Sequence, residues 1–158
     1  MSSARVLGQV RPGHLDHTRL AGLLGYQLAQ ATIPTNNIFK AQVEEVFLLN
    51  KLEFTILMLV ASNEDVTPKR LSSAMNIPAP NLTLVLDRLE KRELLIRSRS
   101  ETDRRVQHVR LTRAGLTMVT KLEAVSARME AALLDHLSDA ERAMLFELLH
   151  KVAAHRRA

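Results

Sequence analysis

The segment Arg97-Ser98-Arg99-Ser100-Glu101-Thr102-Asp103-Arg104-Arg105-Val106-Gln107-His108-Val109-Arg110-Leu111-Thr112 decides what kind of fold the chain adopts. Apolar or neutral residues alternate with charged ones over 95–100 and 106–111, which is the pattern of half-solvated strands. The polar stretch 101–105 separates the two runs, so we expect a two-stranded hairpin. Because the flanking chain has helical periodicity, the sequence predicts a mainly α protein of the α+β class.

The positive charge of the protein is concentrated around this hairpin. Between Arg88 and Arg113 there are nine Lys and Arg residues and four acidic ones, a local net charge of +5 that equals the formal net charge of all 158 residues. A localised basic patch is typical of a protein that holds a polyphosphate, and DNA is the first candidate. An ordinary solvated surface is the alternative that charge alone leaves open.

The composition excludes several classes of site. The absence of cysteine excludes disulfides, thiolate zinc sites and Cys nucleophiles. The six histidines lack partners at metal-ligand spacing, and no glycine-rich phosphate loop or catalytic constellation occurs, so we expect no metal, no cofactor and no enzyme. No apolar run approaches the ~18 residues that span a bilayer, and no signal peptide is recognisable, so we expect a cytoplasmic protein without membrane contact.

The N-terminal part predicts a flexible arm followed by helices. Residues 1–13 lack periodicity, whereas apolar residues recur at helical spacing from His14 onward, so 14–48 is expected to be helical. Pro34 has no amide donor and disfavours helix at the preceding residue, which predicts a break or kink at 32–36. A second helical run is expected from Ile38 to Phe47.

Residues 49–112 carry the signals of a compact lobe. Asn50 and Glu53 have the spacing of a capping box, which predicts a helix from Lys51 to about 62, buried on most sides. Thr67 and Pro68 are a helix cap and first residue for a short helix ending near 75. A turn at 76–80 then leads to a helix at about 79–92. A short helix, a tight turn and an amphipathic helix together predict a helix-turn-helix.

The second helix of this pair has an apolar face and a polar face. We expect the apolar face to pack inward; it consists of Leu82, Val85, Leu86 and Leu89. A helix that contacts base edges in the major groove needs the opposite, outward face, which carries Asn81, Leu84, Asp87, Arg88 and Lys91. Leu84 is either an ordinary exposed leucine or a contact to a thymine methyl group, and both alternatives stay open.

Residues 113–158 predict two long amphipathic helices. Thr112 is the expected cap of the first, whose apolar stripe is Leu116, Val119, Leu122, Val125, Met129, Ala132 and Leu133. A second capping box, at 138–141, begins the last helix, whose stripe is Met144, Leu145, Leu148, Leu149 and Val152. A small lobe cannot bury both stripes, so we expect a homodimer, whose two-fold axis suits a pseudo-palindromic DNA site.

The order of these motifs resembles the MarR family of winged helix-turn-helix transcription regulators. The resemblance covers about residues 20–155 and is carried by the helix-turn-helix, Leu86-Asp87-Arg88-Leu89-Glu90-Lys91-Arg92-Glu93-Leu94-Leu95, Asp103-Arg104-Arg105, Leu111-Thr112-Arg113-Ala114-Gly115 and Leu137-Ser138-Asp139-Ala140-Glu141. It implies an intertwined homodimer of helices 14–48 and 113–158, with a DNA-binding lobe at 49–112 whose wing is 95–111. It also implies a repressor that releases double-stranded DNA when a small aromatic or phenolic anion binds between the dimer helices and the lobe.

The outward helix face, the basic hairpin and the resemblance together give the predicted DNA contacts. Arg105 would enter the minor groove at the wing tip and Asp103 would orient it, with an ordinary surface ion pair as the alternative. The other predicted contacts are Lys69, Arg70, Pro80, Asn81, Thr83, Leu84, Arg88, Lys91, Arg97, Arg99 and Arg104. Candidate residues for the effector pocket are His17, Arg19, Tyr26, Phe54, Met58 and Met118. Phe and Met at helical spacing are more often core residues.

Three positions depart from the family pattern. Leu84 stands where an arginine is common, so Asn81, Thr83 and Arg88 would take a larger share of base recognition. The stretch 78–80 is Pro-Ala-Pro where Ser or Thr is usual, which predicts a helix start without a side-chain cap. Glu93 replaces a frequent glycine at a helix end, where a left-handed backbone is costly.

The alternative function is a winged-helix module for protein interaction or nonspecific DNA binding without an effector. It predicts no sequence preference beyond the salt-dependent affinity for phosphates.

Overall fold

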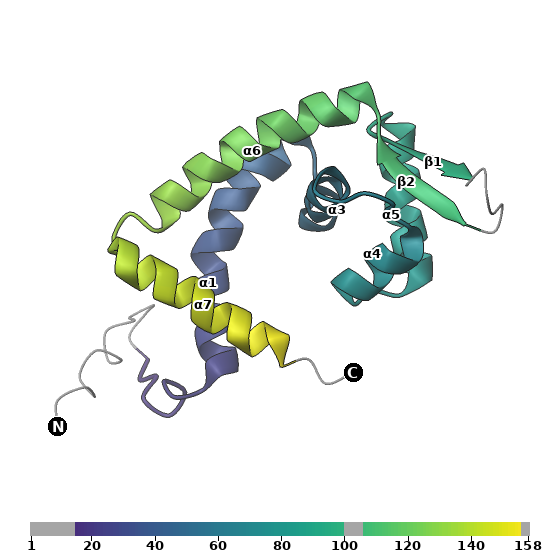
Figure 1. Cartoon of the computed structure of the whole chain (residues 1–158). Coiled ribbons are helices and arrows are strands. Elements are labelled where there is room, and N and C mark those ends of the chain that lie inside the picture. Colours follow the sequence, from purple (N-terminus) through teal and green to yellow (C-terminus); the bar gives the residue numbers. More distant parts are fainter. Residues whose placement is uncertain (1–14, 100–105, 156–158) are drawn as a thin grey trace. The chain divides into compact units, whose positions relative to one another are not determined.

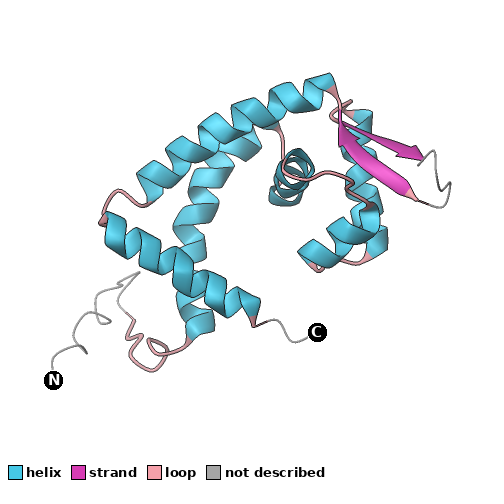
Figure 2. Ribbon diagram, viewed as in Figure 1, coloured by secondary structure: helices cyan, strands magenta, loops and turns pink. Residues whose placement is uncertain are grey.

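The computed structural model describes residues 15–99 and 106–155. Figures 1 and 2 show a mainly helical chain with one β-hairpin, so the predicted fold class is confirmed. The chain divides into two compact units, 1–38 and 39–158. The sequence also predicts boundaries at 48 and 112, between the dimerisation helices and the DNA-binding lobe. These boundaries concern functional segments and stay a prediction. None of the described helices is long and apolar enough to cross a membrane.

The first helix begins later than the sequence suggests. Helix α1 spans Leu24–Phe39, so the expected start at His14 is wrong. Residues 18–22 form turns, in which the amides of Leu20 and Ala21 donate to the carbonyl of His17 at 2.9 and 3.1 Å. The Asp16 carboxylate accepts bonds from the amide and the hydroxyl of Thr18 at 2.9 and 2.6 Å. Short polar side chains that bond nearby backbone compete with helix formation, which explains the difference.

Pro34 does not interrupt α1, so the expected break at 32–36 is also wrong. Proline removes only one amide donor, and cooperative helix formation on both sides keeps the run helical. The irregularity lies further along, in the π-helical turn η1, Lys40–Glu44, where the amide of Glu45 donates to the carbonyl of Lys40. The short helix α2, Glu45–Phe47, follows directly and confirms the helical run expected to end at Phe47.

Helix α3, Lys51–Ala61, begins with the predicted capping box. The Asn50 side chain accepts from the amide of Glu53 at 2.9 Å, and the Glu53 carboxylate accepts from the amide of Asn50 at 3.0 Å. Ile56, Leu57 and Val60 are buried. Leu52, Phe54, Met58 and Leu59 are half-buried and Ala61 is exposed, so the expectation of burial on most sides holds only in part.

Helices α4, Pro68–Met75, and α5, Ala79–Lys91, form the predicted helix-turn-helix. Thr67 caps α4 by accepting from the amide of Arg70 at 3.2 Å. The turn between the helices is possible because Asn76 adopts a left-handed backbone, with φ 51°, which asparagine tolerates. Helix α5 has no side-chain cap, as expected, and its buried residues are the four that were predicted: Leu82, Val85, Leu86 and Leu89.

Strands β1, Leu95–Arg99, and β2, Gln107–Leu111, pair antiparallel in the predicted hairpin. The register runs from Leu95 opposite Leu111 to Arg99 opposite Gln107. The amide of Val109 also donates to the carbonyl of Val66 at 2.8 Å, so the segment before α4 is bonded to the hairpin. The sequence did not indicate this contact, because a single bonded residue leaves no periodic pattern.

Helix α6, Arg113–Leu133, is capped by Thr112, whose hydroxyl accepts from the amide of Gly115 at 2.9 Å. Val119, Leu122, Val125 and Met129 are buried, as predicted. Leu116, however, is 56% exposed, and Ala132 is also exposed, so the predicted stripe is buried only in its middle. Leu116 is exposed because it lies in the wall of an open groove beside β2.

Helix α7, Asp139–Ala154, starts with the predicted capping box of Ser138 and Glu141. Its apolar side chains are all exposed, between 36% and 53%; they are Met144, Leu145, Phe146, Leu148, Leu149 and Val152. Contiguous exposed apolar surface of this kind marks an interaction site.

Candidate nucleic-acid interface

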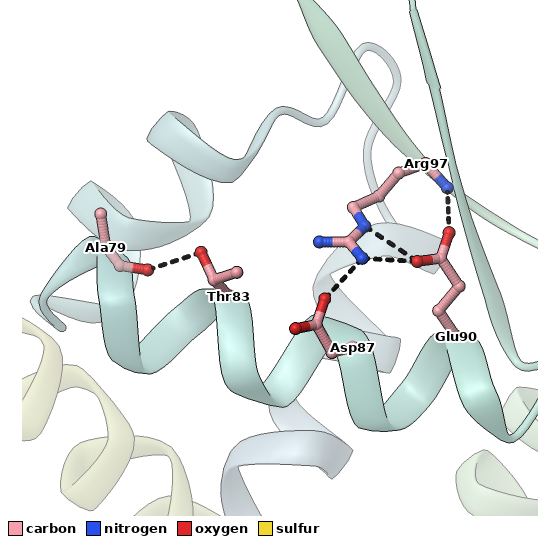
Figure 3. A network of polar contacts seen from close by, with 5 residues as sticks. All are labelled: Ala79, Thr83, Asp87, Glu90 and Arg97. Atoms are coloured by element: carbon pink, nitrogen blue, oxygen red, sulfur yellow. Dashed lines mark hydrogen bonds and ion pairs between the residues drawn. The ribbon is translucent and has the colours of Figure 1, made fainter.

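The outward face of α5 is solvent-accessible, as the sequence predicts. The exposed residues are Pro80, Asn81, Thr83, Leu84, Arg88 and Lys91, and Asp87 is half-buried. Leu84 is 60% exposed, so it is available to a partner on this face. The hydroxyl of Thr83 donates to the carbonyl of Ala79 at 3.0 Å, which fixes it against its own helix (Figure 3).

Arg88 does not lie free on this face. Its Nε donates to Oε1 of Glu53 at 3.0 Å, and its side chain remains 51% exposed while that of Glu53 is 8% exposed. Glu53 belongs to the first turn of α3, so the pair joins α3 to α5. The sequence singled out Glu53 only as a capping residue, and no local pattern reveals a contact across 35 positions.

Arg97 of β1 is held by two carboxylates of α5 (Figure 3). Its Nη2 lies 2.5 Å from Oδ1 of Asp87 and 2.5 Å from Oε2 of Glu90, and its Nε donates to the same Glu90 oxygen at 3.0 Å. The backbone amide of Arg97 donates to Oε1 of Glu90 at 3.1 Å. Both carboxyl oxygens of Glu90 are therefore engaged with one residue, and the hairpin is joined to α5 at this point.

The charges of this network reinforce one another. The hydrogen bonds from Arg97 lower the pKa of Glu90 below its ordinary value, and burial opposes this only in part. The hydrogen bond that Arg97 donates to Glu90 is the largest cause that raises the pKa of Arg97; burial opposes this in part, and the bond to Asp87 raises the pKa further. The Arg97 side chain is only 20% exposed, so the geometry gives it a positioning role within the lobe. Its direct contact with DNA stays a prediction.

The other predicted basic contacts differ in their surroundings. Lys69, Lys91 and Arg99 are exposed. Arg70 is exposed too, but its Nη1 donates to the carbonyls of Glu64 and Asp65 at 3.0 and 2.8 Å, so it also closes the loop before α4. The predicted wing-tip residues lie outside the described residues: Asp103, Arg104 and Arg105.

Two basic residues near the interface were not predicted as site residues. Arg110 of β2 is exposed and stands opposite Ile96 in the hairpin. Arg92, just after α5, donates from its two terminal nitrogens to the carbonyls of Leu48 and Phe47 at 2.6 and 2.9 Å. Carbonyls at a helix end lack partners within the helix, and Leu48 is left-handed, with φ 53°. Arg92 therefore joins the end of α5 to the end of α2.

The predicted effector residues lie in both units. In the N-terminal unit, the His17 ring is hydrogen-bonded to the Tyr26 hydroxyl through Nδ1, and Arg19 is exposed. In the larger unit, Phe54, Met58 and Met118 are half-buried. Phe54 packs edge-on against Phe39 with ring centroids 5.5 Å apart, which favours a core role for it.

An open groove of about 380 Å³ lies elsewhere in the lobe, and none of the predicted effector residues lines it. It lies among the end of α3, the following loop, β2 and the start of α6, and its lining residues are Val60, Ala61, Asn63, Glu64, Asp65, Val109, Arg110, Leu111 and Leu116. The described residues contain no group of three or more His, Asp or Glu side chains placed to hold a metal ion.

Comparison with known proteins gives this arrangement its context. The family model described as MarR family matches residues 49–106, which contain the helix-turn-helix and the first strand of the hairpin. The HTH-type transcriptional regulator MhqR of Bacillus subtilis (strain 168) is 32% identical over 104 residues, covering 66% of this chain and 72% of that protein. The chain belongs to the MarR family. It is therefore a MarR-family transcriptional regulator.

Two further relatives extend the similarity over most of the chain. A putative transcriptional regulatory protein for the hcr operon of Thauera aromatica is 28% identical over 138 residues, which cover 87% of this chain and 83% of that protein. The solved structure of the transcriptional repressor CouR, bound to a 23-mer DNA duplex, is 31% identical, with a TM-score of 0.80, and the match covers 89% of this chain and 99% of that one. The lobe thus has the winged helix-turn-helix fold of the MarR family.

Proposed function

We propose that the protein is a ligand-responsive repressor that binds a pseudo-palindromic operator as a homodimer and releases it when a small aromatic or phenolic anion binds. The observation that carries the proposal is the outward face of α5, which stands beside a hairpin fixed to that helix through Arg97. The same fold occurs in CouR, a repressor bound to duplex DNA. In this proposal α5 is the recognition helix and the hairpin is the wing.

The distribution of charge supports a contact with DNA that combines two kinds of residue. Arg88 and Arg97 are paired with carboxylates, so part of their charge is compensated within the lobe. Lys69, Lys91 and Arg99 are exposed and supply positive charge for phosphates. Phosphate contacts position the protein on the duplex, whereas contacts with base edges determine the sequence that it prefers.

Exposed apolar surface supports the homodimer. Along α7, six apolar side chains are at least 36% exposed, and in the N-terminal unit Leu23, Leu24, Leu28 and Ile33 are between 41% and 53% exposed. Most soluble oligomers are symmetric homo-oligomers, and a two-fold axis would place one recognition helix on each half of a palindrome.

The effector part of the proposal follows from membership of the family. His17, Arg19, Tyr26, Phe54, Met58 and Met118 remain the predicted pocket residues. A thermal-shift screen of aromatic acids and phenols on the full chain tests this part, because a ligand that binds only the folded protein raises its apparent stability. A hit should also reduce the affinity of the protein for its operator, and a hit that leaves DNA binding unchanged would contradict the release step.

The DNA part is tested by selecting bound duplexes from a random pool and comparing the selected duplex with a scrambled one at ~0.15 M salt. We expect the selected sequence to be pseudo-palindromic and to bind about 10³-fold or more tightly than the scrambled one. Equal affinity for the two duplexes would instead support the alternative, a module that binds DNA nonspecifically or serves protein interaction.

A further inference from the structure

Glu53 is a charged side chain inside the lobe. The residue is 6% exposed. Of the residues that the structure describes, it is the only charged one that is buried. Its two carboxyl oxygens have different partners: Oε2 accepts from the amide of Asn50 at 3.0 Å, and Oε1 accepts from Nε of Arg88 at 3.0 Å. A buried carboxylate is costly unless it is paired, so Arg88 is the partner that allows a charge at this place.

The capping role of Glu53 does not require its charge. A capping box works with glutamate or glutamine at this position, because one side-chain oxygen is enough to accept from the cap amide. The second oxygen and the negative charge serve the contact with Arg88, which lies 35 positions further along the chain. The negative charge of Glu53 therefore serves the contact with α5 and is not needed for the cap at the start of α3.

This contact restrains Arg88, a basic residue of the proposed recognition helix. Its side chain stays 51% exposed, four positions after Leu84 and three before Lys91 on the outward face. The bond from Nε fixes the plane of the guanidinium group and leaves the terminal nitrogens as the donors for a partner. Two parallel donors from one arginine suit the paired acceptors of guanine in the major groove.

We propose that Glu53 positions Arg88 for a base-specific contact, so that a residue of α3 determines part of the sequence preference of α5. This inference rests on the proposed function. A freely rotating arginine loses conformational freedom when it binds, whereas a guanidinium already held in one orientation loses less. Because Glu53 also compensates the charge of Arg88, the pair contributes more to the choice of sequence than to the general attraction of phosphates.

The test compares Glu53→Gln with the unchanged protein on the selected duplex, on the scrambled duplex and in a repeat of the selection. Glutamine keeps the cap but removes the charge that holds Arg88. We expect about tenfold weaker binding to the selected duplex and an unchanged affinity for the scrambled one. The base preference should be lost at the same position in Glu53→Gln and in Arg88→Ala. The double variant should behave like Arg88→Ala alone, because the two residues act through one contact.

Glu123→Gln is the matched control, because it makes the same charge change at an exposed position of α6. It should leave both affinities and the selected sequence unchanged. If Glu53→Gln does not fold, Arg88→Lys keeps a positive charge beside Glu53 but lacks the forked donors, and it should lose the same base preference.

Two results would overturn the inference. One is that Glu53→Gln selects the same DNA sequence as the wild type. If Glu53→Gln does not fold, the corresponding result is that Arg88→Lys selects the same sequence as the wild type. The other is an equal loss of affinity for both duplexes, which indicates only a damaged lobe. Either result leaves the proposed function standing. A wild-type protein that selects no sequence refutes the proposed function and the inference together.

Discussion

The first turn of α6 passes so close to Leu94 that Gly115 has no room for a side chain. A β-carbon at position 115 would overlap the carbonyl oxygen of Leu94, which is backbone and cannot rotate away. That same carbonyl accepts the amide of Thr112 at 3.1 Å. The glycine of the Leu-Thr-Arg-Ala-Gly motif is thus required by the packing of α6 against the turn between α5 and β1.

Gly115→Ala should destabilise the protein by about 2 kcal/mol or more, because the backbone must shift to admit the added carbon. Urea unfolding measures the change. Gly25→Ala is the control: it lies in α1, and its β-carbon would meet no atom within 4 Å. Alanine is the better helix former, so the control should be neutral or stabilising by up to about 1 kcal/mol. Equal effects of the two substitutions would contradict the steric account.

Glu90→Gln should weaken the attachment of the wing and change the response of stability to acid. The pKa of Glu90 is lowered in the folded protein from its ordinary value of 4.5, chiefly by the hydrogen bond from Arg97. The stabilisation is therefore present above the unfolded pKa and is lost as the pH falls through the folded pKa. When the free energy of unfolding is measured from pH 7 downward, it should decrease less below about pH 4.5 in the variant than in the wild type.

Glu130→Gln controls for the removal of one carboxylate, since Glu130 is exposed on α6. It should retain the wild-type acid response. If Glu90→Gln and the wild type lose stability in parallel on acidification, the Arg97 network does not stabilise the folded state.

Glu93→Gly should stabilise the protein by about 0.5 to 1 kcal/mol. Glu93 has φ 56°, and the amides of Glu93 and Leu94 donate to the carbonyls of Glu90 and Leu89 at 2.9 and 3.0 Å. This is the bonding pattern of a helix end that favours glycine. Thermal unfolding measures the gain. Asn76→Gly, at another left-handed position with φ 51°, should gain less, because asparagine already tolerates this backbone. A gain at 76 that exceeds the gain at 93 would count against the explanation.

Arg105→Ala should reduce the affinity for the selected operator at least about tenfold, since an arginine in a narrow minor groove contributes to both attraction and recognition. Asp103→Asn should have a smaller effect, because it removes only the group that orients Arg105. Gel-shift titration measures both. Arg128→Ala, at an exposed position of α6, removes the same charge away from the wing and should bind like the wild type. Wild-type binding by Arg105→Ala would falsify the role of the wing tip.

Leu148→Glu should disrupt the homodimer. Leu148 is 51% exposed on α7, and burying a charge in an apolar interface is costly. Sedimentation velocity should show a shift from dimer to monomer, and binding to a palindromic operator should weaken accordingly. His150→Glu adds the same residue at an exposed position of α7 outside the apolar stripe and should remain dimeric. A dimeric Leu148→Glu variant would place the interface elsewhere.

Local signals explain which parts of the fold the sequence predicts. The caps at Asn50, Thr67, Thr112 and Ser138 involve partners three residues away, so the residue type and spacing are enough to find them. The hairpin is equally local, because alternation along each strand defines it. The left-handed backbone of Glu93, just after α5, agrees with the family pattern, in which this position is frequently glycine.

Contacts between distant residues explain what the sequence does not predict. Glu53 and Arg88, and likewise Arg92 and Phe47, are brought together only by the packing of helices, so no spacing rule connects them. Arg97 was expected to face DNA because of its charge, but the two carboxylates beside it become neighbours only in the folded lobe. At Pro34 the helix continues despite the single missing donor, because the cooperativity of the surrounding helix outweighs it.

The two ends of helix α5 are held by different kinds of contact. Its C-terminal end is tied to α2 by Arg92, and the hydroxyl of Thr112 donates to the carbonyl of Glu93 at 2.5 Å, whereas its N-terminal end follows Pro78 without a side-chain cap. Side-chain contacts from Arg92 and Thr112 therefore hold the C-terminal end of α5. Its N-terminal end is held through the turn after α4, where the amide of Ile77 donates to the carbonyl of Ser72 at 3.1 Å and the Ser72 hydroxyl donates to the carbonyl of Ile77 at 2.7 Å. In the proposed DNA complex, α2 and the residue that caps α6 would therefore set the position of the C-terminal end of α5.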